Sequence, residues 1–524
     1  MSENGNDRTR EGKLITRLRD RRTIETALAH MLTTQTDEEW NQKAQHIASL
    51  GPEVLRVLTQ KLNTANTAEL AALGTIATYA DRDLVTQALY GLLYKPDTPD
   101  VQRMGAILLL ERYLGEPVPE TALMSLQDPR GVVQQSLVQV LEAARESRFL
   151  LLEYLRILLE QPAEATHAVI DALAEIGGDE VIGLLRLLAQ DEELAIAEHA
   201  LDTLAALQTP AALQALQSLP PTLPPPLRDR TERALRKIRF RGQEVAPLPP
   251  VPQQCRALVS PVDGRGNQVL WFLRHDPVTQ RDRFLSVLVS DAAGLKNTFG
   301  DDAALPDRFP QQRPPGTLHV VPAENQPLIL LEAPYDYGRR LLLQGLTISF
   351  GLGLSTPLEY RLLNDLVWGY QLPSELPLRR PTVSPAQQLT LLPWLGRLLD
   401  HPALESWFVE SESVYTYVER MTRWQHIDIH DPAMQRWLMN LVTEHFTPEA
   451  LARYQDRLVQ MSEWFLWADD EDTARLAWVA AATLPHVPPQ QHPLVVRMIE
   501  TGLVTAAENM QRGFDLRKTP EAFD

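Results

Sequence analysis

Apolar residues recur at helical spacing along most of the N-terminal half of the chain. In one clear unit, Gly177 and Gly178 end a helix, and Asp179 is placed to cap the next one. The following segment, 181–188, carries apolar side chains at the i, i+3, i+4 and i+7 positions that form one face of a helix. An acidic turn, Asp191–Glu193, separates it from a second amphipathic helix. The pattern therefore predicts paired helices divided by short polar or small-residue breaks.

The spacing of these pairs is typical of a helical repeat. From Ile176 to Leu207 is 31 positions, and Gly51-Pro52 and Thr98-Pro99 punctuate the upstream sequence in the same way. Periods of this length indicate supersecondary units that stack and bury their apolar faces on one another. We expect a mainly α protein whose N-terminal half is an α-solenoid. A helical bundle without solenoid stacking is the alternative.

Two runs carry a resemblance to a known family. The run from Ile176 to Leu185 and the run from His199 to Leu207, with the acidic turn between them, resemble the short HEAT-like repeat of the phycobilin-lyase type. The resemblance covers roughly residues 50–217 and departs from the family at 195–198, where the usual arginine after the acidic turn is missing. Because the family includes lyases, assembly factors, scaffolds and DNA-repair enzymes, the resemblance implies a fold and not one activity. Residues 255–524 resemble no family.

The pattern changes at Cys255. Runs rich in β-branched and aromatic residues predict a small antiparallel sheet with strands at 256–262, 268–274, 284–289, 317–321 and 328–331. Helical periodicity returns after Pro334 and predicts helices at 335–350, 357–369, 384–399, 403–424, 431–446, 448–467, 472–484 and 492–510.

The predicted organisation has six parts. They are a flexible N-terminus (1–19), a HEAT-like helical repeat domain ending in a basic helix (20–241), a proline-rich linker (242–254), a small antiparallel β-sheet module (255–334), a helical region (335–512) and a flexible tail (513–524). The fold class is thus an α-solenoid followed by an α+β module and a C-terminal helical bundle.

Charge is unevenly distributed along the chain. The net charge of −18 opposes broad binding to phosphate backbones. The segment 228–241 is the exception, since it holds seven basic and two acidic residues. Its cations are the candidate partner-binding residues Arg228, Arg230, Arg233, Arg236, Lys237, Arg239 and Arg241. They form either a patch for an acidic partner or the polar outer face of a helix that caps the repeats.

Motifs for catalysis and metal binding are missing. The chain has neither the Gly-x-Ser-x-Gly string of a nucleophile elbow nor a phosphate-binding loop. We predict no catalytic residue and no cofactor. We also predict no metal site, because a helix start at Asp431 leaves His430 just before the helix, so that His426 and His430 do not share one helical face. Asp291, at a strand end, is a low-priority polar site or an Asx turn. Cys255 is the only cysteine, so an internal disulfide is excluded.

Apolar runs in this sequence are too short to cross a membrane, which favours a cytoplasmic protein without membrane insertion. Three functions remain. The first is a non-catalytic adaptor that binds a protein partner through the repeat surface. The second is a bilin-lyase-like or other cofactor-handling enzyme. The third is association with nucleic acid through the basic helix. The sequence leaves the partner and the oligomeric state open.

Overall fold

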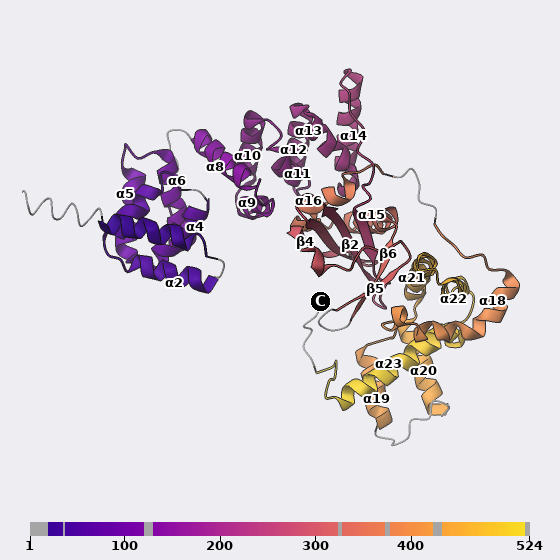
Figure 1. Ribbon diagram of the computed structural model, residues 1–524. Helices are drawn as coiled ribbons and strands as arrows, with labels where there is room; N and C mark the ends of the chain where they lie inside the picture. The colour runs from indigo at the N-terminus through magenta and orange to yellow at the C-terminus, as the bar shows by residue number, and fades with distance from the viewer. Residues whose placement is uncertain are drawn as a thin grey trace, which may run out of the picture. The chain divides into compact units, whose positions relative to one another are not determined.

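The computed structural model describes residues 19–34, 37–65, 67–119, 129–322, 327–372, 378–422 and 432–518. The chain divides into two compact units, Met1–Val181 and Ile182–Asp524, and each is described by itself. Helices dominate both units, and the second also contains a small antiparallel sheet (Figure 1). The mainly helical fold with a small sheet is therefore confirmed, whereas solenoid stacking stays a prediction.

The described residues of unit 1 form helices and the short connections between them. Its named helices are α2 (Asp37–Ala48), α3 (Glu53–Lys61), α4 (Thr67–Tyr79), α5 (Arg82–Tyr94), α6 (Asp100–Leu108), the π-helical η1 (Leu109–Leu114), α8 (Pro129–Ala143), α9 (Phe149–Leu159) and α10 (Ala163–Ile176). Asp81 caps α5 by accepting a hydrogen bond from the backbone N–H of Leu84. At the end of α10, Gly177 has a φ of +63°, which only glycine adopts readily.

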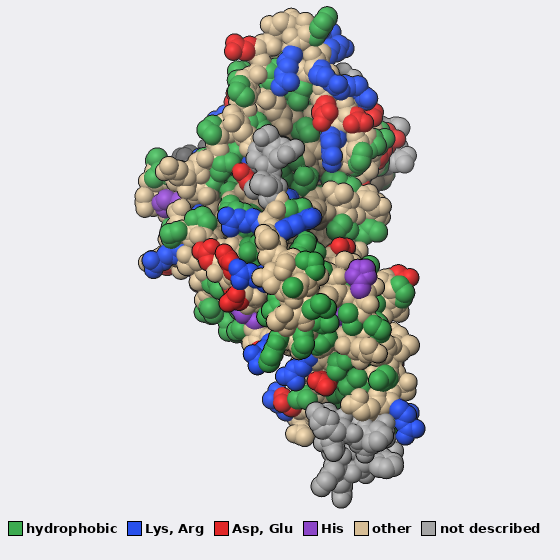
Figure 2. Space-filling view, turned by 90° about the vertical axis from the view of Figure 1, so that its right-hand side faces the viewer, with side chains coloured by type: hydrophobic (Ala, Val, Ile, Leu, Met, Phe, Trp, Pro, Cys, Tyr) green, Lys and Arg blue, Asp and Glu red, His purple; other side chains and the backbone are tan. Residues whose placement is uncertain are grey.

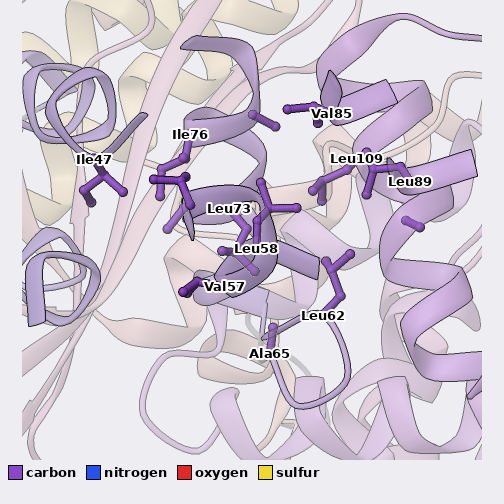
Figure 3. Close-up of a cluster of buried hydrophobic side chains, with 14 of the residues drawn as sticks. Ile47, Val57, Leu58, Leu62, Ala65, Leu73, Ile76, Val85, Leu89 and Leu109 are labelled. Carbon is purple, nitrogen blue, oxygen red and sulfur yellow. The ribbon is translucent and has the colours of Figure 1, made fainter. Parts of the chain in front are cut away.

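Leucine and isoleucine side chains from α2 to η1 meet in one core (Figure 3). Ile47 of α2, Leu58 of α3, Leu73 of α4, Leu89 of α5 and Leu109 of η1 are all at most 2% exposed. Each fully buried side chain of this size contributes about 1.5–3 kcal/mol relative to an exposed one. The apolar stripe of each helix thus supplies the core of this unit.

Unit 2 begins with helices that each pack on the next along the chain. They are α11 (Ile182–Leu188), α12 (Leu194–Leu207), α13 (Pro210–Ser218), the 3-10 turn η2 (Pro220–Thr222) and α14 (Pro225–Phe240). The helix pair predicted around Asp191 is confirmed. Thr209 caps α13 by accepting from the N–H of Ala212, and a proline occupies its first turn.

A six-stranded sheet follows the proline-rich segment. Its strands are β1 (Cys255–Val259), β2 (Asn267–Asp276), β3 (Arg281–Ser290), β4 (Gly294–Ala304), β5 (Leu318–Val321) and β6 (Leu328–Ala333). The spatial order is β4-β3-β2-β1-β6-β5, and every pair is antiparallel. The five predicted strands are all present. The sequence prediction missed β4, because this edge strand is polar and contains two glycines.

Three helices cover one face of the sheet: α15 (Tyr335–Gly351), α16 (Leu358–Leu363) and α17 (Asp365–Trp368). The backbone of α15 approaches β3 closely at Gly345, where a Cβ atom would lie 2.9 Å from a methyl carbon of Val289. A side chain at this position would push the helix away from the sheet.

The rest of unit 2 is helical in its described residues. It contains α18 (Pro385–Leu391), η4 (Leu392–Asp400), η5 (Pro402–Leu404), α19 (Glu412–Thr422), α20 (Pro432–His445), α21 (Pro448–Trp467), α22 (Glu471–Thr483), η6 (Pro489–Gln491) and α23 (Pro493–Gln511). The single helix predicted at 403–424 is wrong in its first part. After the short η5 turn, residues 405–411 form no helix, and the N–H of Val409 bonds the carbonyl of Met498 on α23.

Candidate functional site on helix α14

Helix α14 buries one stripe and presents the opposite one to solvent. Leu227, Thr231, Leu235 and Ile238 are buried at helical spacing. This stripe packs on α12 and α13, so α14 closes the run of helices from α11. The amphipathic pattern of the segment therefore sets which of its seven cations reach solvent.

Two of the seven predicted partner-binding cations are used within the fold. The guanidinium of Arg228 donates to the carbonyls of Pro220 and Leu223, at 3.1 and 3.3 Å, and so holds the turn before the helix. The guanidinium of Arg230 pairs with Asp202 on α12, at 2.6 Å, and with Glu198, at 3.2 Å. These two cations are therefore engaged within unit 2.

The other five cations are exposed, and so is the aromatic Phe240, which lies between Arg239 and Arg241 in the sequence. In the described residues, none of their side chains pairs with a carboxylate. We call this set the cationic ridge: Arg233, Arg236, Lys237, Arg239, Arg241 and Phe240. Lys and Arg side chains gather at the top of the view in Figure 2, the height at which α14 ends in Figure 1.

Helical geometry aligns part of the ridge. Arg233, Arg236, Lys237 and Phe240 are spaced i, i+3, i+4 and i+7, which puts them on one face opposite the buried stripe. Phe240 is 94% exposed. Cations in a last helical turn are favoured by the helix dipole, by about 0.3–1 kcal/mol each. The dipole accounts for Lys237 but neither for Arg233, one turn earlier, nor for Phe240.

A shallow groove of about 460 Å³ lies beside the ridge. Its lining includes Leu235 and Arg239 of α14, Val245 and Leu248 of the proline-rich segment, and Leu372 after α17. The groove joins segments that are far apart in the sequence, so its existence could not be read from the sequence.

Hydrogen bonds hold the proline-rich segment in place along this groove. The side-chain amide of Gln217 donates to the carbonyl of Ala246, and the backbone N–H of Gln371 donates to the carbonyl of Pro249, both at 2.8 Å. The segment predicted to be a linker is thus fixed at two points.

A buried polar network joins α11 to α16. Arg186 donates to Asn364 at 2.5 Å, and Asn364 donates to Gln190 at 2.6 Å. Gln190 in turn donates to the carbonyl of Arg361 at 3.3 Å. Burial lowers the pKa of Arg361, although Asp191 and Glu192 oppose this effect. The network was missed by sequence reasoning, because its members are scattered among ordinary helical residues.

Asp291, the low-priority polar site, is committed to an ion pair. Both of its carboxylate oxygens accept hydrogen bonds from Arg457 of α21. Arg457 also donates to the backbone carbonyls of Gly264 and Arg265, at 2.8 and 3.1 Å. This arrangement ties the start of strand β2 and the end of strand β3 to α21. A structural role therefore accounts for Asp291 at the strand end, and no catalytic role is needed.

One cluster of two serines and a histidine contains the residue types of a catalytic serine–histidine pair. The hydroxyls of Ser411 and Ser413 each lie 3.0 Å from Nε2 of His445. Ser411 is also placed to accept from the N–H of Val414 in the first turn of α19. Among the described residues, no group bonds Nδ1 of His445, so the ring lacks the orienting partner of a catalytic triad. The role of Ser411 in this cluster is therefore to accept a backbone hydrogen bond at the start of α19.

Metal ligands do not cluster in the described part of the chain: no group of three or more His, Cys, Asp or Glu side chains could hold an ion there. His426 and His430 lie outside the described residues. The acidic run 469–472 begins α22, and Asp470 accepts from the N–H of Thr473, as expected of an N-cap.

Within the described ranges, no helix has the length and apolar character needed to span a bilayer. Comparisons with family models, with curated proteins and with solved structures gave no match for this chain. The function must therefore be argued from the side chains on α14 and the groove beside it.

Proposed function

We propose that this protein is a non-catalytic adaptor that holds an acidic protein partner on the cationic ridge of α14. The observation that carries the proposal is the exposure of Phe240 and of five cations without a carboxylate partner in the described residues. Arginine and aromatic side chains are the residues most enriched at the energetic centres of protein interfaces. Phe240 is 94% exposed, so its ring adds little buried apolar area to the fold of its own chain.

Two features favour a protein partner over nucleic acid. The net charge of −18 and the exposed carboxylates on or just beyond α14 (Asp229, Glu232 and Glu244) oppose a continuous phosphate backbone more than an acidic protein segment, whose charge is less dense. The apolar residues that line part of the groove, such as Leu235, Val245 and Leu248, suit an apolar side chain better than a phosphate.

The scaffold part of the proposal extends to the N-terminal half. Helices that pack in chain order and the resemblance around Ile176–Leu207 support a HEAT-like solenoid. In this proposal the solenoid holds the ridge at its end, and a reducing cytoplasm is the compartment that suits a chain whose single thiol is Cys255.

Charge reversal tests the proposal. The full-length tagged chain is purified from its host in three forms: unchanged, with Arg233, Arg236 and Lys237 replaced by Glu, and with a matched control. The control reverses three exposed cations elsewhere, Lys296→Glu, Arg313→Glu and Arg453→Glu, and so changes the net charge equally.

We expect a stoichiometric acidic protein to co-purify with the unchanged chain and the control, and to be lost from the ridge variant. If all three forms of the chain retain the partner, the ridge is not the surface that binds it. If the captured material disappears after nuclease treatment instead, the nucleic-acid hypothesis replaces the adaptor. Size-exclusion chromatography with light scattering identifies the case in which the acidic partner is a second copy of this chain.

A further inference from the structure

The groove beside α14 differs in chemistry from the ridge. Leu235 and Leu248 are buried below it, whereas Leu372 at its side is 52% exposed. Apolar side chains thus line part of a hollow that is open to solvent, and Arg239 of the ridge is the cation in its lining. A single protein interface commonly combines an apolar hollow with a charged rim in this way.

The groove is held in shape before any partner arrives. The Gln217–Ala246 bond fixes one side, and the Gln371–Pro249 bond fixes the other. A preformed groove costs less ordering free energy on binding than one that must assemble. Its volume of about 460 Å³ matches a short segment of chain and not a whole folded surface.

The residues that line the groove also indicate which kind of peptide segment it would bind. Arg239 belongs to both the ridge and the groove, so a bound segment must place a carboxylate beside an apolar side chain. The side-chain amide of Gln371 has no hydrogen-bond partner in the described residues and lies at the rim. An amide can both donate to and accept from the backbone of a bound segment.

We propose that this groove binds a short acidic peptide segment of the partner and takes one of its apolar side chains as an anchor. The inference rests on the proposed adaptor function and names the chemistry that the ridge and groove recognise together. The ridge would attract and orient the acidic residues, while the groove would select the segment by its anchor.

The test uses the full-length chain and two fluorescein-labelled peptides. One peptide has a leucine at the centre of a run of glutamates, and the other has a serine in its place. Fluorescence anisotropy measures the affinity of each at moderate salt. We expect the leucine peptide to bind at least about tenfold more tightly, which is the order expected from burying one leucine side chain.

Two variants separate the groove from the ridge. Leu372→Asp places a charge in the groove at an exposed position, and Leu389→Asp makes the same change on α18, where the side chain is 74% exposed. We expect Leu372→Asp to abolish the preference for leucine and Leu389→Asp to keep it. Circular dichroism checks that both variants keep the helical content of the unchanged chain.

The outcomes are distinguishable. Equal binding of both peptides, lost on reversing the charges of the ridge, would overturn the groove while leaving the adaptor proposal standing. A failure of both peptides to bind, together with a partner that co-purifies independently of the ridge, would overturn both. Displacement of the leucine peptide by a single-stranded oligonucleotide at equal concentration would also overturn the inference, because the site would then recognise phosphate.

Discussion

The ion pair between Arg457 and Asp291 should be a stabilising tie of unit 2, and replacing Arg457 by Met tests this. Methionine keeps most of the side-chain volume while removing all of its hydrogen-bond donors. The Arg457 side chain is 8% exposed and that of Asp291 25% exposed. The replacement leaves one carboxylate without its cation and removes a donor from the carbonyls of Gly264 and Arg265.

The magnitude follows from these contacts. Removing one partner of a buried ion pair costs about 3–5 kcal/mol, because the remaining charge is left without compensation. Asp291 keeps some access to water, so we expect the lower end of this range, about 3 kcal/mol. A loss of this size lowers the melting temperature of a unit this large by roughly 4 °C. The milder Asp291→Asn keeps an acceptor and should cost about 1–2 kcal/mol.

Differential scanning calorimetry of the full-length chain measures the effect. Arg453→Met is the matched control, since Arg453 lies one turn earlier on α21 and is exposed. Its melting temperature should stay within about 1 °C of the unchanged chain. If Arg457→Met also melts within that interval, the tie contributes nothing. The acid at the end of β3 would then need a different explanation, and a functional role for Asp291 would return.

Two further predictions concern titrating groups. Burial lowers the pKa of His492 to about 4. Since the unfolded chain takes up the proton near the ordinary pKa of 6.5, stability should fall as the pH drops from about 6.5 to 4, by at most about 3 kcal/mol in total. Urea unfolding across this range should show the loss in the unchanged chain and not in His492→Asn; parallel pH profiles would contradict it. Burial also raises the pKa of Cys255, against the effects of Tyr370 and nearby arginines. Alkylation by iodoacetamide should therefore be slow at neutral pH and become fast in urea, and equal rates in both conditions would show that the thiol is accessible.

The local sequence pattern correctly predicted those helices and strands whose residues all favour the same secondary structure. Helix α12 and helix α14 were expected because their apolar stripes continue without interruption, and the strands around Trp271 and Leu285 because their residues favour extended backbone. Strand β4 was missed, since its polar residues are held extended by pairing with β3 and not by their own preference. Helix 403–424 was overpredicted for the converse reason: a contact of Val409 with α23 overrides local helical spacing.

The candidate site was predictable only in part. Composition singled out the cations of α14, but it could not tell that Arg228 and Arg230 are used inside the fold while Arg233 is free to meet a partner. That difference depends on where Asp202 and the turn at Pro220 lie in space. The groove depends on contacts between residues more than a hundred positions apart, such as Pro249 and Gln371. No local pattern records such contacts.

The two hydrogen bonds on the proline-rich segment limit how its length can change. A tether between two folded parts tolerates insertions, because its ends need only stay within reach. Here the carbonyls of Ala246 and Pro249 must both meet fixed donors. One residue added between them would displace one carbonyl by about 3 Å, farther than a hydrogen bond can stretch. The number of residues from Ala246 to Pro249 is therefore fixed by the positions of Gln217 and Gln371, so an insertion there should be tolerated less well than one in a free tether.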